Sequence, residues 1–274
     1  MPIDVTADLN DDMTLDPPGR IAVVGAGPLG LEAALYGRFL GYDVTVFERG
    51  QIGESLRDCQ DQPLPMLPSE CLSPLAAGAL RAQFGKESMA SQPSLPLTIG
   101  QWLSDGLERL SKTDLLQGRV LTGAQVTRVT MIDPTPTDDP PAEGPPSLLQ
   151  TPAGDAEPDD DFEVIGEVPP DFRVTWVGNS ENDAAEDRSD ADPLTQSADF
   201  EAIIWATGVS SDSVPGLEEH LTAPYFFRIG DGADLPAADT RSADRLRSGW
   251  NQIVRLYARL GGRAGLDLYR PLRL

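Results

Sequence analysis

The sequence predicts an α/β fold that combines a parallel sheet with a separate antiparallel β-meander. The first observation is a short apolar run, residues 21–24, that leads into a glycine-rich turn and a helix-forming segment. The second is a pair of short segments, 126–132 and 172–177, in which apolar and polar residues alternate as they do in half-buried strands. Continuous apolar runs are typical of buried parallel strands, and alternating runs are typical of antiparallel strands with one exposed face. The two patterns together therefore indicate two sheets.

The glycine-rich turn, Gly25-Ala26-Gly27-Pro28-Leu29-Gly30, is the most informative feature of the chain. Gly25 permits a tight turn at the end of the strand, Gly27 lets the backbone approach a pyrophosphate, and Gly30 lets the next helix lie close to the strand. The N–H groups at the start of that helix carry partial positive charge and bind phosphates. The turn therefore predicts a Rossmann-like site for an adenine dinucleotide.

The residues after the turn complete a βαβ unit. Residues 31–40 are rich in helix formers with apolar side chains on one side, and Gly41 is a suitable C-cap. A second apolar strand, residues 44–48, ends in Glu48, eighteen residues past Gly30, where an acid accepts the hydroxyls of a ribose. An ordinary βαβ unit that binds no ligand is the alternative.

Length and charge set the expected domain organisation. The chain has 274 residues and a formal net charge of -23, and residues 133–199 supply most of it, with nineteen acids against two arginines. Acidic, proline-rich sequence buries too little apolar surface to offset the entropy of ordering. We therefore expect a flexible lead-in at 1–19 and a single domain at 20–274, with mobile acidic insertions at about 133–161 and 179–197.

Composition also excludes several classes of protein. No run of eighteen apolar residues is present, so we expect no membrane span, and the acidic N-terminal segment lacks the apolar core of a signal peptide, so we expect a cytoplasmic protein. The acidic chain repels nucleic acid. With one histidine, His220, and with Cys59 and Cys71 outside any CxxC spacing, we predict no metal site.

The second half of the chain is expected to complete the site. Segments 126–132, 172–177 and 200–205 predict a three-stranded antiparallel meander, whose last strand runs into Thr207 and Gly208. A strand that ends in small residues brings backbone close to a ligand at the carboxyl edge of a sheet.

One more strand and one helix follow. Residues 225–229 form an apolar strand that delivers Gly230 and Asp231 to the edge of the sheet. The helix after it carries an apolar stripe from Leu246 to Leu260 and ends at a glycine pair.

This order of motifs resembles the FAD domain of the pyridine nucleotide-disulfide oxidoreductase and flavin-containing monooxygenase superfamily. The resemblance implies that the glycine turn holds the FAD pyrophosphate and that Glu48 holds the adenosine ribose. It also implies that Arg49 flanks the adenine and that Val126 offers backbone groups to it.

The later motifs carry further implied roles. Thr207 and Gly208 would line the cofactor, and Asp231, after Gly230, would hydrogen-bond the ribityl chain or the pyrophosphate region. The second acidic site at Asp231 favours FAD over a nicotinamide dinucleotide.

Two departures from the superfamily stand out. Only 22 positions separate Gly208 from Gly230, too few for a second nucleotide-binding βαβ unit, and no second GxGxxG occurs, so no dedicated NAD(P)H domain is expected. Cys59 and Cys71 lie twelve positions apart rather than in a close redox pair. Electrons would then come from the substrate, from a partner protein, or from NAD(P)H that binds transiently.

The leading hypothesis is an FAD-dependent oxidoreductase that acts on a small-molecule substrate or a redox partner protein, with a substrate site built from residues 51–98. Ser69, Glu70 and Cys71 are candidates to face the flavin ring, with solvent-facing or core roles as the alternative, and no catalytic residue is assigned. One alternative is a flavin-binding module without turnover of its own. Another is an NAD(P)-binding, dehydrogenase-like protein, which the lack of a Tyr-x-x-x-Lys pair disfavours.

Overall fold

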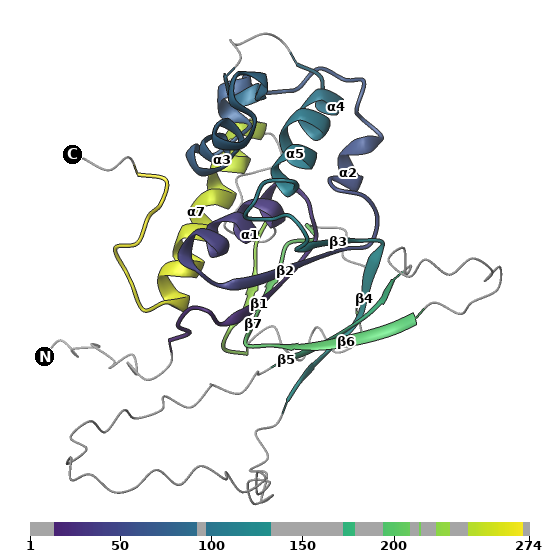
Figure 1. Ribbon diagram of the computed structural model, residues 1–274, viewed down its shortest axis with the longest axis vertical. Helices are drawn as coiled ribbons and strands as arrows, with labels where there is room; N and C mark the ends of the chain where they lie inside the picture. Colours follow the sequence, from purple (N-terminus) through teal and green to yellow (C-terminus); the bar gives the residue numbers. More distant parts are fainter. Residues whose placement is uncertain are drawn as a thin grey trace, which may run out of the picture.

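The computed structural model describes residues 14–91, 97–132, 172–178, 194–208, 214, 223–230 and 241–270. They form three layers: helices, a parallel sheet, and an antiparallel meander (Figure 1). The expected insertion at 133–161, residues 179–193 of the second insertion, residues 1–13 of the lead-in, and Asp231 lie outside the described residues.

The parallel sheet has five strands in the order β3-β2-β1-β7-β8. The strands are β1 (Arg20–Val24), β2 (Asp43–Glu48), β3 (Val120–Thr122), β7 (Ala202–Trp205) and β8 (Phe226–Arg228). Because all five run the same way, their carboxyl ends meet at one edge, where open α/β sheets bind ligands. The α/β class with a parallel sheet and a separate meander is confirmed.

Helices α1 (Pro28–Leu40) and α7 (Ser242–Leu260) pack together at close range. A Cβ atom at Gly37 would lie 2.4 Å from the Tyr257 hydroxyl oxygen, and one at Gly249 would lie 2.4 Å from a Leu29 methyl carbon. The Tyr257 hydroxyl donates to the Ala33 carbonyl at 2.8 Å. Two glycines therefore let the predicted C-terminal helix lie directly on the helix that follows the glycine turn.

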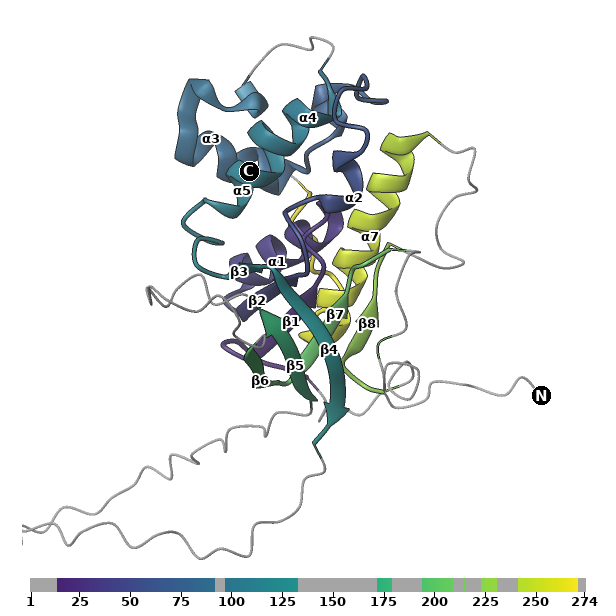
Figure 2. The same cartoon turned by 90° about the vertical axis from the view of Figure 1, so that its right-hand side faces the viewer.

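A group of short helices fills the connection between β2 and β3 and lies above α1 in the views of Figures 1 and 2. They are α2 (Glu54–Arg57), α3 (Pro74–Phe84), α4 (Ile99–Trp102), a π-helical turn (Leu103–Leu107), α5 (Glu108–Ser111), and 3₁₀ turns at Pro68–Glu70, Gly85–Glu87 and Met89–Ser91. The Ser73 hydroxyl accepts the Ala76 N–H at 2.9 Å and so caps α3.

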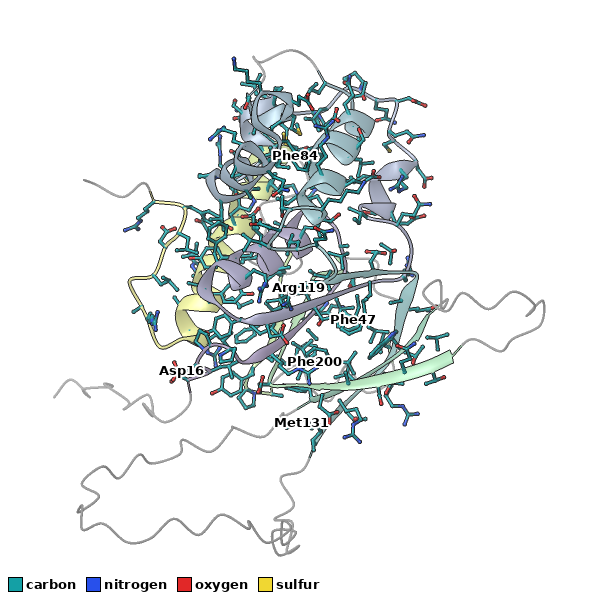
Figure 3. The ribbon with its side chains drawn as sticks, viewed as in Figure 1. Asp16, Phe47, Phe84, Arg119, Met131 and Phe200 are labelled. Atoms are coloured by element: carbon teal, nitrogen blue, oxygen red, sulfur yellow. The ribbon has the colours of Figure 1, made fainter. Side chains whose placement is uncertain are left out.

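The meander packs on the sheet face opposite α1 and consists of β4 (Ala124–Met131), β5 (Phe172–Gly178) and β6 (Leu194–Phe200). Aromatic rings fill the space between the two sheets: Phe47 lies 4.8 Å from Trp176 and 5.8 Å from Phe200, centroid to centroid (Figure 3).

The prediction that residues 200–205 form the third meander strand was wrong. β6 begins at Leu194, inside the segment expected to be an insertion, and Ala202–Trp205 is a parallel strand between β1 and β8. The physical reason is burial: all four residues of β7 are buried, as in a central parallel strand covered on both faces. The chain turns from one sheet into the other at Glu201.

In the parts of the chain that the structure describes, no helix is both long and apolar enough to span a bilayer. Among the same residues, no cluster of three or more histidine, cysteine or acidic side chains has the arrangement of a metal site.

Candidate functional site

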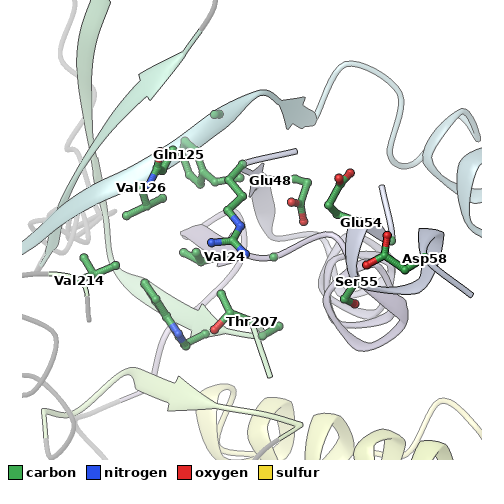
Figure 4. Close-up of a pocket in the computed structure, with 17 residues that line it drawn as sticks. Val24, Glu48, Glu54, Ser55, Asp58, Gln125, Val126, Thr207 and Val214 are labelled. Carbon is green, nitrogen blue, oxygen red and sulfur yellow. The ribbon is translucent and has the colours of Figure 1, made fainter. Parts of the chain in front are cut away.

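A cleft of about 360 Å³ opens at the carboxyl edge of the parallel sheet. Figure 4 shows its walls: Val126 and Val214 stand at one end, and Glu54, Ser55 and Asp58 at the other. The lining residues come from β1 and its turn, β2 and the following loop, α2, β4, and the end of β7: Val24, Gly25, Gly27, Phe47, Glu48, Arg49, Gly53, Glu54, Ser55, Asp58, Ala124, Gln125, Val126, Trp205, Ala206, Thr207 and Val214.

The three glycines of the turn have different geometric roles. Gly25 has a φ of +105°, and a Cβ there would lie 2.8 Å from the Ala206 carbonyl oxygen. A Cβ at Gly30 would lie 1.9 Å from the Gly25 carbonyl oxygen. A Cβ at Gly27 would meet nothing within 4 Å, because Gly27 faces the cleft. Two glycines therefore close the turn, and the third leaves space for a ligand.

Both backbone polar groups of Ala26 are hydrogen-bonded. Its N–H donates to Glu48 Oε2 at 2.8 Å, and its carbonyl accepts the Gly53 N–H at 3.1 Å. Glu48 Oε1 accepts the Gly50 N–H at 3.0 Å, and the residue is 8% exposed. Because each carboxylate oxygen has two lone pairs, Glu48 positions the turn and still has acceptor capacity toward the cleft.

β4 forms the opposite wall. It is an edge strand of its sheet, so its outer backbone N–H and C=O groups point away from β5. The pairing with β5 shifts between Val126 and Arg128, a β-bulge at which the Thr127 hydroxyl donates to the Thr175 carbonyl at 3.3 Å. Bulges of this kind re-aim a strand next to a site. Gln125 and Val126 thereby line the cleft.

The end of β7 supplies the third wall. The Ala206 N–H donates to the Val24 carbonyl at 2.8 Å, which fixes Thr207 beside the glycine turn. Trp205, to which no motif assigned a role, lines the cleft with its indole ring, 6.4 Å from Phe226. No described residue accepts a hydrogen bond from its buried Nε1.

The loop after β2 contributes lining residues that belong to the segment 51–98, where the substrate site is expected, although none of them was singled out. Gly53, with a φ of +64°, packs so closely on the π-helical turn that a Cβ would lie 2.3 Å from a Leu103 methyl carbon. This packing sets the start of α2 and turns Glu54, Ser55 and Asp58 to the cleft. The sequence signal for this wall is a glycine followed by polar residues shortly after Glu48. Whether these residues face the cleft depends on the contact with Leu103, which is distant in the chain.

The charge of the cleft is uneven. Three carboxylates, Glu48, Glu54 and Asp58, and one guanidinium, Arg49, line it. Glu54 and Asp58 disfavour an anion at their end by like-charge repulsion. At the glycine turn, by contrast, Gly27 is the N-cap of α1 and makes no side-chain cap, so the first N–H groups of the helix face an anion favourably.

Of the predicted site residues, Gly25, Gly27, Glu48, Arg49, Val126 and Thr207 are brought together in the cleft wall. Ala26, Pro28, Leu29 and Gly30 lie in the turn and the first turn of α1 without lining the cleft. Gly208 and Gly230 follow β7 and β8 at the same edge but are not lining residues either. The Gly230 N–H donates to Gln252 Oε1 at 3.0 Å, which ties this edge to α7.

The candidates for a ring-facing group do not line the cleft. Glu70 forms an ion pair with Arg247 at 3.0 Å and lies 3.8 Å from Arg241. Cys71 is buried, its thiol donates to the Pro68 carbonyl at 3.0 Å, and burial raises the pKa of this thiol to about 12. Cys59 and Cys71 are both free thiols. The structure therefore favours the alternative of core or surface roles for Ser69, Glu70 and Cys71.

The fold and the cleft define a Rossmann-like α/β domain with its site at the carboxyl edge of the sheet. The profile of the pyridine nucleotide-disulphide oxidoreductase family matches residues 20–56, which span β1, α1, β2 and the start of α2. This match confirms the resemblance over the segment that carries the glycine turn and Glu48. No curated protein sequence matches the chain.

A reductase, an oxygenase and THI4 are among the solved structures to which the chain is similar. Bacillithiol disulfide reductase from Bacillus cereus is 17% identical, with 77% of this chain and 47% of that chain covered and a TM-score of 0.40. S-allyl-L-cysteine S-oxygenase from Allium sativum is 17% identical, with 69% and 36% covered and a TM-score of 0.39. THI4 from Thermovibrio ammonificans is 17% identical, with 88% and 90% covered and a TM-score of 0.44. The chain thus spans less than half the length of the first two proteins.

Proposed function

We propose that the cleft binds FAD and that the protein is an FAD-dependent oxidoreductase acting on a small molecule or a redox partner protein. The observation that carries the proposal is the meeting of Gly27, the start of α1 and Glu48 at one cleft. These are the groups that a pyrophosphate and a ribose require.

The residues at this end fit the adenosine diphosphate half of FAD. The open space at Gly27 and the uncapped start of α1 suit the pyrophosphate. Glu48 suits the ribose hydroxyls, and the outer edge of β4 at Val126 offers backbone groups to the adenine, with Arg49 beside it. Thr207 closes the site from β7.

The acidic end of the cleft constrains the pose. Glu54 and Asp58 repel phosphate, so the pyrophosphate belongs at the glycine turn and the uncharged part of the ligand faces α2. Gly208, Gly230 and Asp231 are assigned, as part of the proposal, to the ribityl side of the site.

When bound, the isoalloxazine ring of FAD supplies the redox chemistry, which belongs to the cofactor. The chain's own residues bind and orient it. The internal spacing of 22 positions between Gly208 and Gly230 leaves no room for an inserted NAD(P)H domain. The electrons then come from the substrate, from a redox partner, or from NAD(P)H that binds without a dedicated domain.

The test is the visible absorption spectrum of the freshly purified protein, with released flavin identified and counted per chain. We expect a flavin band and close to one FAD per chain. A colourless protein that also fails to take up added FAD would overturn the proposal, and stabilisation of such a protein by NAD would favour the dehydrogenase-like alternative.

A second candidate is a flavin-binding module that depends on a partner for electrons, which the same internal spacing favours. Anaerobic addition of NADH or NADPH to the flavin-loaded protein separates the two. Bleaching of the flavin band supports an oxidoreductase that uses nicotinamide, whereas a persistent band with NADH, NADPH and candidate substrates supports the partner-dependent module.

A further inference from the structure

A buried carboxyl group on α1, that of Glu32, lies outside the cleft. Glu32 is 3% exposed, and its Oε1 accepts two hydrogen bonds, from the Ser73 hydroxyl at 2.6 Å and from the Tyr269 hydroxyl at 2.9 Å. The three residues come from α1, from the cap of α3, and from the segment after α7. One carboxyl oxygen therefore joins three separate parts of the fold.

On the α3 side, the Ser73 hydroxyl makes two hydrogen bonds. Its oxygen accepts the Ala76 N–H at 2.9 Å, and its O–H donates to Glu32. The cap of α3 is thus oriented by the carboxyl group on α1.

On the C-terminal side, residues 266–270, which we call the strap, follow α7 (the yellow segment in Figure 1). The Leu268 N–H donates to the Tyr36 hydroxyl at 3.0 Å. The Tyr269 ring lies 5.3 Å from the Tyr36 ring and 6.1 Å from the Trp250 ring. The hydrogen bond from the Tyr269 hydroxyl to Glu32 is the link between the strap and the buried carboxyl group.

We propose that Glu32 is a proton-operated latch: the protonated carboxyl group holds the strap on α1 beside the cap of α3, and loss of the proton loosens the strap. This inference does not rest on the proposed function, because none of the groups involved lines the cleft.

The direction of the pH dependence follows from burial. Burial raises the pKa of Glu32 from 4.5 to about 7, and the hydrogen bonds from Ser73 and Tyr269 offset this in part. Release of the strap returns water to the carboxyl group and restores an ordinary pKa. Docking therefore takes up a proton between pH 4.5 and 7. The equilibrium constant for release of the strap rises by up to about tenfold per pH unit in that window. Its total rise is roughly 300-fold at most, and it levels off above pH 7.

The other groups around Glu32 stay neutral across this window. Burial raises the pKa of Tyr269 on the strap, of Tyr257 on α7 and of Tyr36 on α1, so all three remain phenols. Ser73 does not titrate. The negative charge of Asp267, also on the strap, helps to raise the pKa of Tyr36. The chain has a single histidine, so few other groups change charge near pH 6.

Amide hydrogen exchange at Leu268 tests the latch, since this N–H is bonded only while the strap is docked. We compare the wild type with Glu32→Gln at pH 5.5, 6.5 and 7.5, after correction for the intrinsic exchange rate. In the wild type, the equilibrium constant for release of the strap is expected to rise about sevenfold from pH 5.5 to 6.5, and less from pH 6.5 to 7.5. Glu32→Gln keeps an acceptor for both hydroxyls without a charge, and its release is expected to be independent of pH.

Glu70→Gln is the matched control, because Glu70 pairs with Arg247 instead and its loss should leave the pH dependence intact. An equal pH dependence in the wild type and Glu32→Gln, or none in either, would overturn the latch. A carbon-13 titration of the Glu32 carboxyl group in the folded wild type does not depend on any variant. A midpoint near pH 7 supports the latch, and one near pH 4.5 overturns it.

Discussion

At the scale of single residues, the glycine turn divides its tasks among three positions that look alike in sequence. Gly25 and Gly30 are required because a Cβ atom at either position would come within 3 Å of a backbone oxygen, whereas Gly27 faces open space. Stability and ligand binding should therefore respond to different glycines.

Gly27→Val should abolish flavin retention and change the free energy of unfolding by less than about 1 kcal/mol, because Gly27 has a φ of -74° and its Cβ would meet no atom. Gly30→Ala is the contrasting variant and should lose about 2–4 kcal/mol through its clash with Gly25. Urea unfolding and flavin content per chain measure both effects. Equal flavin retention in Gly27→Val and the wild type would contradict the role of this glycine.

Glu48→Gln should destabilise the protein by about 1–3 kcal/mol even without a ligand. Glu48 accepts N–H groups from Ala26 and Gly50 with separate oxygens, and an amide offers only one oxygen, so one N–H would face an NH₂ group. Glu54→Gln, at a side chain that is 51% exposed, is the control and should stay within about 0.5 kcal/mol. Equal unfolding midpoints in the two variants would be inconsistent with the clamp on Ala26.

The two cysteines should differ in reactivity. Burial raises the pKa of Cys71 to about 12, and its thiol is bonded to the Pro68 carbonyl, so little thiolate is present at pH 8. Cys59 is partly exposed. A chromogenic disulfide reagent should label Cys59 in the native protein and Cys71 only after unfolding, as mass spectrometry of the labelled peptides would show. Fast native labelling at Cys71 would contradict its burial.

At the scale of elements, the contact between α1 and α7 depends on small residues. Gly37→Ala should cost about 1–3 kcal/mol, because its Cβ would approach the Tyr257 hydroxyl oxygen to 2.4 Å and disturb the bond to Ala33. Gly78→Ala is the matched control in α3, where a Cβ meets nothing within 4 Å, and should stabilise by about 0.5–1 kcal/mol. Thermal melts of the two variants should move in opposite directions.

The elements that the sequence predicted well are those with local signals. The turn at 25–30, the strand that ends at Glu48 and the Gly41 cap of α1 are all confirmed, since each is specified by neighbouring residues. β7 was misplaced because a four-residue apolar run does not reveal which sheet it joins. Glu54 and Asp58 lie in the segment 51–98 expected to build the substrate site, but they could not be singled out because their lining depends on Gly53 packing against Leu103.

At the scale of the whole molecule, the two ends of the meander differ in their relation to the cleft. The register of the meander pairs Met131 with Phe172 at the end of β4 remote from the cleft, whereas Ala124, a lining residue, pairs with Gly178. The long acidic connection therefore leaves the meander at the end that does not touch the site.

Replacing residues 133–170 with an Asn-Gly turn should preserve the fold and flavin retention, because Met131 and Phe172 are already paired and a two-residue hairpin turn spans this distance. The shorter loop should raise the free energy of unfolding by about 2 kcal/mol through a smaller closure entropy. The change also removes eleven carboxylates. Urea unfolding measures the expected gain in stability, and flavin content per chain measures retention. Loss of bound flavin would show that the acidic segment contributes to the site.

The two hydrogen bonds of the Ala26 backbone, to Glu48 and to Gly53, bear on the order of folding. Both bonds form within one short stretch of chain, so the loops that they close are small. Ala206 and Thr207 reach the same turn only after most of the chain has been arranged. Because local contacts form faster than distant ones, the glycine turn should belong to the folding nucleus and the β7 wall should dock late. In φ-value terms, a substitution at Glu48 should slow folding, and one at Ala206 should mainly speed unfolding.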